Sequence, residues 1–516
     1  MLRNKKIFLI GIIFIFAVFL FLRFYNLLAL PIFNDEAIYL NWAKDIHFNW
    51  SDNKFTSLAS ITGKPPLHYW ILALGYHWFG DPLYSGRFIS ILAAILSFWG
   101  VFLLTQKLFH SKLTTLIALS LYTFCPFVLL YERMVLADVF ISAIGIYIFY
   151  FSWLIFSESE KNERPKNLRW VWPVIVLGLL FSLGRLFKQT ILIFILVTGL
   201  ILLWSILKNK FRFKQIIFLV SEFILAYGLS ELICRLIIPT KLLAGSNFLA
   251  SFFVFNFKEF SGSFLDAWFK NLRIIGEVFI KYFTWPILVV FIIGCFKNKF
   301  WRESKIQWLI FLIFFPLIIF VLISNIFYPR YFLFIAPFFI ILIAFFIANF
   351  GRNLARFKYF KVTVCLLLFL LILAPSLYQD YQLLKNPLKF NWTKIDDDFV
   401  NQWSSGYAIT KVGDYLAVNS KDDQVLFLDT SLGYPFAYLY LYEENLPYLK
   451  LAQINFNLAE YIEIARKTES IKPILILLNP DRRPEDREFE KSDICQNQKR
   501  FYQPNNINHY TLCFIN

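Results

Sequence analysis

The sequence predicts a polytopic α-helical membrane protein with a smaller C-terminal α/β domain. The 516 residues are 58% hydrophobic, whereas soluble domains contain about 45–50% apolar residues. The apolar residues form long blocks that lack charge, as membrane-crossing helices require. After about Tyr378 the composition becomes mixed and polar, with short strand-like runs. We therefore expect a transmembrane domain at 1–378 and a soluble domain at 379–516.

About eleven segments approach the roughly 20 apolar residues that a bilayer-crossing helix needs. The first follows MLRNKK and exceeds the about 7–15 apolar residues of a secretory signal, so we interpret it as an uncleaved span. The shorter, aromatic segment 67–80 favours an interfacial helix instead. The predicted spans are 7–30, 84–106, 113–131, 138–157, 170–185, 190–207, 215–238, 278–296, 306–326, 331–350 and 360–378.

Lys and Arg in the connecting segments predict the orientation of the spans in a cell membrane. With the N-terminus in the cytoplasm, the segments on that side include RNKK, KNKFRFK and FKNKFWRESK, and the opposite segments carry fewer cations for their length. The net charge of +16 then reflects topology. Membrane lipids are expected as partners, and no nucleic acid is. This orientation places the first outer loop, 31–83, and the C-terminal domain outside the cytoplasm.

The C-terminal segment has the pattern of a small α/β domain. QVLFLD at 424–429 and KPILILL at 472–478 resemble buried strands, and 456–468 has helical periodicity. An exported domain permits a disulfide between Cys495 and Cys513, but the sequence does not decide whether they pair. The other cysteines fall in predicted spans and are interpreted as packing residues: Cys125, Cys234, Cys295 and Cys365.

Ionisable side chains gather at the predicted outer ends of the spans. Charged groups at membrane depth are costly and are functional candidates by default. Each also has a structural alternative, because Lys and Arg can reach the interface and Asp35 can cap a helix that starts at Glu36. Their common face favours function. These residues are Asp35, Glu36, Lys64, Arg133, Asp138, Arg185, Lys188 and Arg330.

Carboxylates and cations on one face suit a reaction between a membrane-bound phosphate donor and an acceptor outside the cytoplasm. A carboxylate can take the proton of an acceptor hydroxyl. Lys and Arg can hold a phosphate and offset the charge of the leaving group.

The order of several motifs resembles that in the GT-C membrane glycosyltransferases. These motifs are NDEAIY, GKPPLHYWILALGYHWFG, RMVLAD, a Lys after the fifth span and RYFLFIAP. Over about 1–380 the chain is similar to the dolichyl-phosphate-mannose protein mannosyltransferase-like group, which includes the lipid A aminoarabinose transferases. The resemblance implies an inverting glycosyltransferase that takes a sugar from a polyprenyl-phosphate donor and passes it to an extracytoplasmic glycan, lipid or protein.

The resemblance also implies roles for the acids. Asp35 matches the general base of the first outer loop, and Glu36 is its neighbour in the same motif. Asp138 matches a second acid that supports the site by orienting groups or a metal ion. No cofactor is certain, and a divalent metal stays open. The assignment of Asp35 as the base rests on the resemblance, because spacing does not distinguish it from Glu36.

The basic motif positions are implied to bind the donor. Lys64 matches the Lys of the KP motif near the donor phosphate, and Lys188 and Arg330 match basic positions near the lipid phosphate. For His68, which follows the KP motif, aromatic anchoring at the interface is the alternative. The further substrate-binding candidates are Arg133, Arg185, Tyr331, Tyr39, His68 and Tyr69.

The chain departs from the family pattern at two places. Gly63 stands where the aminoarabinose transferases carry Glu, and Ile38 stands where they carry Arg. Both departures argue against that exact substrate, and the first argues against a metal held at Gly63. The C-terminal domain lacks a β-trefoil repeat, although Trp403–Leu416 resembles a segment of bacterial members with an external α/β domain. The acceptor is therefore unassigned.

Two other functions are alternatives to glycosyl transfer. A transporter or lipid flippase would also place charges among spans, but transporters usually show repeated halves and broken helices at mid-membrane. The sequence shows no repeat, and its charges cluster at one face. A non-catalytic envelope protein is the other alternative, which the complete set of Asp35, Lys64 and Asp138 disfavours.

Overall fold

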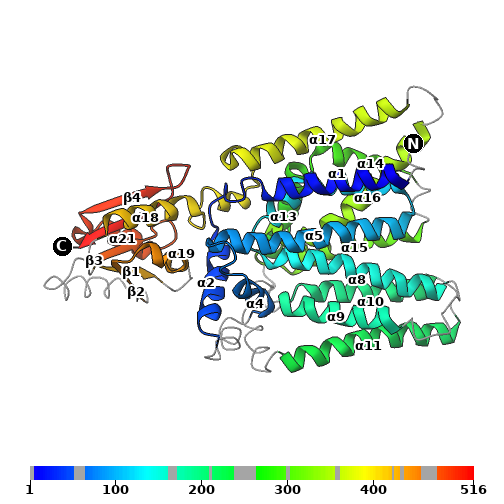
Figure 1. Ribbon diagram of the computed structural model, residues 1–516, viewed down its shortest axis with the longest axis horizontal. Helices are drawn as coiled ribbons and strands as arrows, with labels where there is room; N and C mark the ends of the chain where they lie inside the picture. Colours follow the sequence, from blue (N-terminus) through cyan, green and yellow to red (C-terminus); the bar gives the residue numbers. More distant parts are fainter. Residues whose placement is uncertain are drawn as a thin grey trace. The chain divides into compact units, whose positions relative to one another are not determined.

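The computed structural model describes most of the chain and divides it into two compact units (Figure 1). The first unit consists of Met1–Tyr25, Trp50–Ile71 and Phe88–Leu384, and the second of Asn26–Asn49, Leu72–Arg87 and Lys385–Asn516. The described residues are 5–50, 64–160, 171–208, 212–237, 263–297, 303–354, 361–420, 424–429, 435–454 and 474–515.

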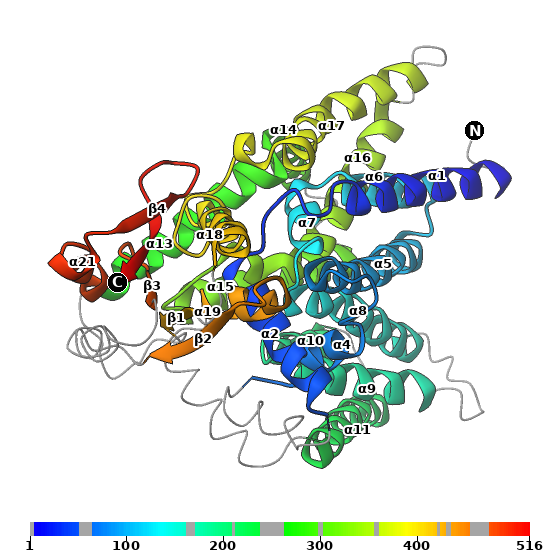
Figure 2. The same cartoon turned by 60° about the vertical axis from the view of Figure 1, so that its left-hand side comes forward.

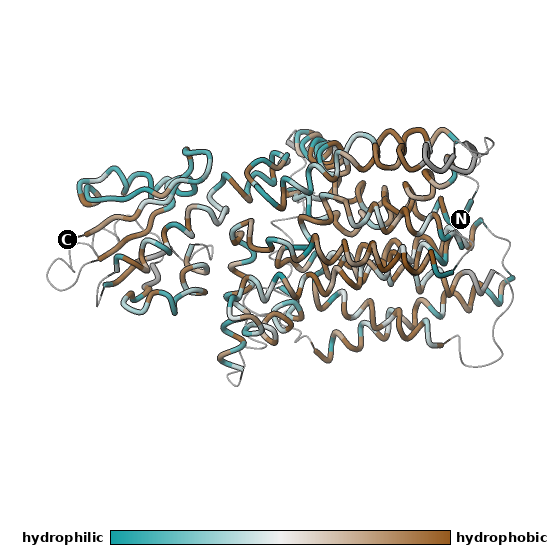
Figure 3. Tube along the Cα trace, turned by 45° about the horizontal axis from the view of Figure 1, so that its top comes forward, coloured by the Kyte–Doolittle hydropathy of each residue, from teal (hydrophilic) through white to brown (hydrophobic). Residues whose placement is uncertain are grey.

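The first unit is a bundle of long apolar helices, which run roughly alongside one another (Figures 1 and 3). Among the described residues, eight helices are long and apolar enough to cross a membrane. The chain is therefore a multi-pass membrane protein, as the hydrophobic blocks predicted. Its long helices are α1 (Lys5–Phe24), α5 (Pro82–Phe109), α8 (Ala137–Glu160), α10 (Ile191–Lys208), α11 (Phe213–Ile237), α15 (Ser304–Ile323), α16 (Ala336–Leu354) and α17 (Lys361–Lys385).

Two predicted spans are broken helices. α6 (Lys112–Thr123) and α7 (Pro126–Glu132) meet at a bend of 59°, and α13 (Ser263–Val278) with its π-helical end η3 (Phe279–Phe283) meets α14 (Trp285–Cys295) at 109°. A proline lies at the first or second position of the helix after each break, where its missing N–H removes no helical hydrogen bond. The prediction of continuous helices was wrong here, because the apolar composition runs through both breaks.

The number of membrane spans also differs from the prediction. Each of the eleven predicted segments coincides with a helix or a bent pair, but length and composition support eight spans among the described residues, or ten with the bent pairs. The remaining segment is α9 (Val171–Phe187), an apolar helix of only 17 residues. It lies beside α11 in both views (Figures 1 and 2).

Burial differs strongly among the helices of this bundle. In the most apolar stretch of the span formed by η5 (Pro329–Ile335) and α16, 94% of the residues are buried. In the corresponding stretch of α1 only 17% are buried. A helix that is apolar on all sides must be enclosed by protein or by lipid. α16 is therefore the central helix of the unit, and α1 exposes its apolar side chains to the surroundings of the bundle.

The centre of the second unit is a five-stranded mixed sheet of order β2-β1-β3-β5-β4. β1 (Gln424–Asp429) pairs in parallel with β2 (Leu449–Ile454) and β3 (Ile474–Leu478). β5 (His509–Ile515) pairs antiparallel with β3 and β4 (Gln498–Tyr502). Every residue of β3 is buried, as expected for an inner strand covered on both faces. Both predicted strands are confirmed, whereas the predicted helix 456–468 lies outside the described residues.

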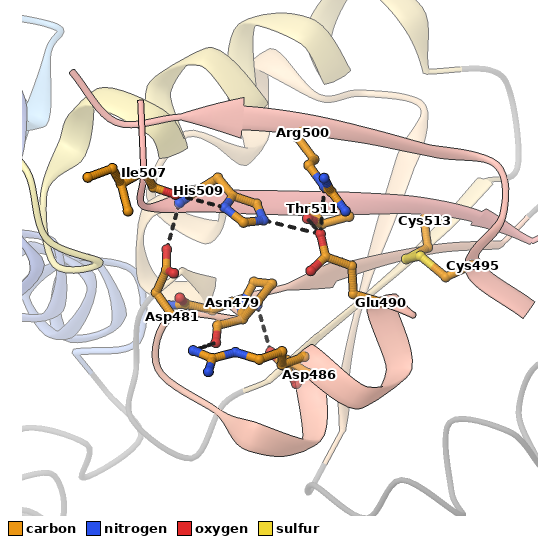
Figure 4. A network of polar contacts seen from close by, with 12 residues as sticks. Asn479, Asp481, Asp486, Glu490, Cys495, Arg500, Ile507, His509, Thr511 and Cys513 are labelled. Carbon is orange, nitrogen blue, oxygen red and sulfur yellow. Dashed lines mark hydrogen bonds and ion pairs between the residues drawn. A yellow bond between two sulfur atoms is a disulfide. The ribbon is translucent and has the colours of Figure 1, made fainter. Parts of the chain in front are cut away.

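Helices and a disulfide complete this sheet domain. Its helices are α18 (Gly406–Asn419), α19 (Phe436–Leu441) and α21 (Pro484–Glu490). Cys495 and Cys513 form a disulfide, which ties the turn before β4 to β5 (Figure 4). Of the other cysteines, Cys125 and Cys234 are buried and Cys295 is partly buried, in agreement with packing roles. The side chain of Cys365 lies outside the described residues.

A polar network joins α21 to the antiparallel strands (Figure 4). Glu490 Oε1 accepts hydrogen bonds from Arg500 Nε at 2.8 Å, Thr511 Oγ1 at 2.7 Å and the His509 ring at 3.1 Å. Burial alone would raise the pKa of Glu490, but these bonds and charges outweigh burial and leave its pKa below the ordinary value. The network therefore holds a charged carboxylate at this edge of the sheet.

The second unit also includes part of the segment predicted as the first outer loop. Helix α2 (Asn34–Phe48) contacts α19, where Lys44 Nζ lies 2.8 Å from Glu443 Oε1 and 2.6 Å from the Tyr440 carbonyl oxygen. A side chain on Gly406 would meet the Ile32 carbonyl oxygen at 2.2 Å, so only glycine permits this approach. Contacts thus group α2 with the C-terminal domain, whose continuous part in this unit begins at Lys385.

The predicted interfacial segment 67–80 contains a short helix. α4 (Leu67–Leu74) has eight residues, so it is too short to cross a bilayer. The chain then turns, and Asp81 accepts a hydrogen bond from the Tyr84 N–H at 2.7 Å as α5 begins.

Candidate active site

The first unit brings Asp138 and Lys188 together from separate helices. Lys188 Nζ donates to Asp138 Oδ1 at 2.7 Å, and the two side chains are 26% and 8% exposed. Asp138 lies in the first turn of α8, where the helix dipole favours a negative charge. Lys188 directly follows the last residue of α9. The ion pair therefore joins the start of α8 to the end of its neighbour α9.

Tyr331 and Arg330 lie beside this ion pair on η5. The Lys188 ammonium is 4.7 Å from the centre of the Tyr331 ring. The Arg330 guanidinium is 4.9 Å from the Tyr328 ring and 5.7 Å from the Tyr331 ring. Cations at such distances are attracted to the face of an aromatic ring. Tyr331 therefore has two cations near its ring, Lys188 from just after α9 and its neighbour Arg330 on η5.

His68 and Lys64 belong to the same neighbourhood. His68 is 1% exposed, and its ring lies 5.7 Å from the Phe140 ring of α8. Burial, with a smaller contribution from the charges of Lys188 and Lys64, lowers the pKa of His68 to about 3. His68 is therefore neutral at physiological pH and offers hydrogen bonding without charge. Tyr69, the next residue, is also buried.

We call Lys64, Asp138, Lys188, Arg330 and Tyr331 the cationic cluster. It contains three cations and one carboxylate. Lysine and arginine donors of this kind bind phosphate well. Each member is a candidate from the sequence, and all five lie in the first unit. Lys188 contacts Asp138 and Tyr331, and Lys64 and Lys188 are close enough to His68 to affect its pKa.

Arg133 and Arg185 have other contacts. Arg133 is buried and donates to the Tyr25 carbonyl oxygen at 2.9 Å. Arg185 donates to Glu231 Oε2 of α11 at 2.8 Å, and Arg235 donates to the other oxygen of that carboxylate. The described contacts of both candidates are thus with neighbouring protein groups.

Glu36, in the second unit, is fully enclosed by hydrogen bonds. Arg87 Nε and Nη2 donate to its two carboxylate oxygens at 2.9 and 2.7 Å, and the Phe33 N–H donates at 3.0 Å. Both Glu36 and Arg87 are at most 1% exposed. The remaining Arg87 donors reach carbonyl oxygens at Leu27 and Leu30. Sequence reasoning missed Arg87, whose only signal is a cation near the start of an apolar span.

Asp35 has a different environment from its neighbour. α2 begins at Asn34 with Phe33 as its N-cap, so the alternative in which Asp35 caps a helix that starts at Glu36 is wrong. Asp35 lies in the first turn of α2 and is partly exposed. Tyr39 lies four residues further on, on the same helical face, with its ring 6.0 Å from the Trp42 ring. One face of α2 thus presents Asp35 and Tyr39.

No group of three or more His, Cys, Asp or Glu side chains suited to a metal occurs among the described residues. Gly63, where the family resemblance placed a difference in metal ligation, lies outside them. Asp138 contacts a lysine at 2.7 Å, and a second acid at that point would be needed for a divalent ion of the usual oxygen-rich kind.

An apolar groove opens between α13, α14, α15 and α16 in the first unit. Its volume is about 430 Å³. Its wall includes Leu272, Phe279, Phe291, Leu322 and Phe339. Asn271, next to Leu272 in α13, donates to the Ser324 carbonyl oxygen at 2.9 Å. Arg330 lies a short distance after Ser324 in the sequence. The groove can take a hydrocarbon chain but offers almost no polar partner.

Comparisons with known proteins agree with this architecture. A family model described as dolichyl-phosphate-mannose-protein mannosyltransferase matches residues 63–232, a stretch that contains Lys64, Asp138 and Lys188. No curated protein matches the chain in sequence.

Two solved structures share the fold across most of the chain. ArnT from Cupriavidus metallidurans, bound to undecaprenyl phosphate, has a TM-score of 0.61 and 12% identity, with 98% of each chain covered. The archaeal oligosaccharyltransferase AglB from Archaeoglobus fulgidus, in complex with an inhibitory peptide and dolichol phosphate, has a TM-score of 0.59 and 12% identity, with 92% of this chain and 70% of that chain covered. The fold is therefore the GT-C glycosyltransferase fold, as the order of motifs predicted.

Proposed function

We propose that this chain is an inverting glycosyltransferase that moves a sugar from a polyprenyl-phosphate donor to an acceptor outside the cytoplasm. The carrying observation is the cationic cluster, in which Lys188 and Arg330 approach the Tyr331 ring and Asp138 holds Lys188. The shared fold with structures that contain undecaprenyl phosphate or dolichol phosphate supports a lipid phosphate as the ligand.

The cluster would bind the phosphate of the donor. Lys188, Arg330 and Lys64 supply positive charge, and the neutral His68 can add a hydrogen bond. These groups would also stabilise the negative charge that develops on the phosphate as the sugar leaves. The apolar groove between α13 and α16 would hold the first isoprene units of the lipid, whose apolar surface gains by leaving water.

We assign the general base to Asp35. Glu36 already accepts three hydrogen bonds, and using it as a base would leave the buried Arg87 charge uncompensated. Asp35 would take the proton of the acceptor hydroxyl, and the acceptor oxygen would form a bond to the anomeric carbon. The bond from that carbon to the phosphate oxygen breaks, and polyprenyl phosphate leaves with the electron pair. Attack opposite the leaving group inverts the anomeric configuration.

The proposed orientation follows from the Lys and Arg pattern of the sequence. The N-terminus would lie in the cytoplasm, and the reaction and the sheet domain would lie outside it. Cys495 and Cys513 form a disulfide, which is typical of an exported domain. The sheet domain would then shape access of the unidentified acceptor to the site.

A lipid flippase is the second candidate, because the bends of 59° and 109° are broken helices of a kind found in transporters. The two functions are separated by transfer of radiolabelled sugar from synthetic polyprenyl-phosphate donors, with purified protein in nanodiscs and an extract of envelope glycans, lipids and proteins as acceptors. Transfer by the wild type, lost in Asp35→Asn, supports the proposal. No transfer with any donor, together with movement of labelled lipid between leaflets of proteoliposomes, would replace it with the flippase.

A further inference from the structure

Arg23 lies in the last turn of α1, and its guanidinium is bound entirely inside the first unit. Nε and Nη2 donate to Glu132 Oε2 at 3.0 and 2.7 Å, and Nη1 donates to the Thr123 carbonyl oxygen at 2.8 Å. Phe19 covers the guanidinium at 3.9 Å. Arg23 is fully buried. It therefore ties the end of α1 to the ends of α6 and α7.

These bonds close the joint of a broken helix. α6 ends at Thr123 just before the 59° bend, and the last carbonyl oxygens of a helix have no partner within it. Arg23 donates to those of Tyr122 and Thr123 and places a positive charge at the negative end of the helix. The Tyr122 hydroxyl donates to Glu132 Oε1. Glu132, the last residue of α7, thus binds both sides of the joint.

Arg133 makes the reverse connection. It is the residue after Glu132 and donates to the Tyr25 carbonyl oxygen at 2.9 Å, two residues after Arg23. The ends of α1 and α7 are therefore bound to each other twice, once by an arginine from each side.

Only residues 133–136 separate this joint from α8, which carries Asp138. These four residues are buried. The Met134 N–H donates to the Tyr131 carbonyl oxygen at 3.1 Å, and the Leu136 N–H donates to the Met134 carbonyl oxygen at 2.8 Å. A segment this short and this bonded has little freedom to absorb a shift. A displacement of Glu132 would therefore be passed on to Asp138.

Two simpler roles explain the arrangement less well. A buried ion pair is weak evidence for stability, because hydrophobic replacements of similar size are often neutral or stabilising. A second anion site is disfavoured by charge. Arg23 already pairs with the carboxylate of Glu132, and Asp380, which is 2% exposed on α17, lies near both arginines.

We propose that Arg23 and Glu132 are positioning residues, which hold the segment 133–138 so that Asp138 keeps Lys188 in the geometry needed at the donor phosphate. This inference rests on the proposed function for its effect on catalysis. Its structural part, the restraint of 133–138 by Arg23, does not depend on the reaction.

The test replaces the ion pair by apolar side chains of similar length in Arg23→Met/Glu132→Met. The matched control is Arg273→Met/Glu277→Met, which removes an exposed ion pair of the same unit from α13. Amide hydrogen exchange by mass spectrometry reports on 133–138, thermal unfolding reports on the fold, and sugar transfer gives kcat and donor KM.

We expect exchange of the 133–138 amides to rise about tenfold in the double variant, with exchange in α11 unchanged. We expect kcat to fall about 100-fold, because small misplacements of a site have effects of this size. The control should match the wild type in each measurement. If the double variant does not fold, Tyr122→Phe, which removes only the hydroxyl bond to Glu132, should show the same changes to a smaller extent.

Unchanged exchange at 133–138 in a folded variant would overturn the inference, and so would faster exchange with an unchanged kcat. An inactive wild type would instead refute the proposed function, and the exchange measurement would still decide whether Arg23 restrains the segment.

Discussion

Arg87 donates to both carboxylate oxygens of Glu36, at 2.9 and 2.7 Å, from a position 51 residues further along the chain. This ion pair gives the two adjacent acids of α2 different surroundings. Glu36 is enclosed by Arg87 and the Phe33 N–H, whereas Asp35 in the same turn of α2 is partly exposed.

The first prediction separates these acids. Asp35→Asn should lower kcat about 10²–10⁴-fold, the usual contribution of a general base, and should leave the melting temperature nearly unchanged. Glu36→Gln should instead destabilise the protein by about 3–5 kcal/mol, because it leaves the buried Arg87 charge uncompensated. Kinetics and thermal unfolding of both purified variants check this. The assignment of the base fails if Asp35→Asn keeps wild-type activity.

The second prediction concerns the donor phosphate. Lys188→Met and Arg330→Met should each raise the donor KM and lower kcat, because each removes a cation from the cationic cluster. Asp138→Asn should weaken sugar transfer because Asp138 acts by holding Lys188. Asp138→Asn/Lys188→Met should therefore lower kcat/KM by less than the two single changes combined. A double-mutant cycle of kcat/KM measures this coupling, and strict additivity would contradict it. Arg185→Met, at an ion pair with Glu231, is a useful comparison.

The third prediction concerns pH and His68. Because burial first, and the charges of Lys188 and Lys64 second, lower the pKa of His68 to about 3, the unfolded chain, in which histidine titrates near about 6.5, binds more protons between these values. The stability of the first unit should therefore rise as the pH rises from about 3 to about 6.5. His68→Gln should flatten this part of the profile.

The lowered pKa of His68 also predicts that His68 does not set the pH dependence of activity. A histidine with a pKa of about 3 stays neutral between pH 5 and 8, so the activity profile of His68→Gln in this range should have the wild-type shape. A changed midpoint would show that His68 titrates there. Thermal unfolding and transfer rates measured on the same samples separate the two effects.

The fourth prediction concerns the sheet domain. The disulfide between Cys495 and Cys513 closes a loop of sequence separation 18, so its loss should destabilise the domain by about 3 kcal/mol. Reductant should lower the melting temperature of the wild type and leave that of Cys495→Ser/Cys513→Ser unchanged. Cys125→Ser, at a buried free thiol, should retain the sensitivity to reductant. An equal effect of reductant on the double variant would contradict the prediction.

Much of the fold could be predicted because its signals are local. Hydrophobic blocks predicted the helices, and short apolar runs predicted the strands at 424–429 and 472–478. The breaks before Pro126 and Pro286 were missed, because the composition remains apolar through them and each proline is compatible with the first turn of a helix. The grouping of α2 with α19 was also missed, since Lys44 and Glu443 lie far apart in the chain.

The sequence by itself determined the membrane architecture, the presence of an α/β domain and the set of residues that could carry chemistry, because composition, period and motif order are properties of short segments. Only the tertiary structure decided that Lys188 meets Asp138, that Arg185 meets Glu231 and that Glu36 is held by Arg87. Such pairs depend on how helices pack, and a buried charge must find its partner wherever packing places one.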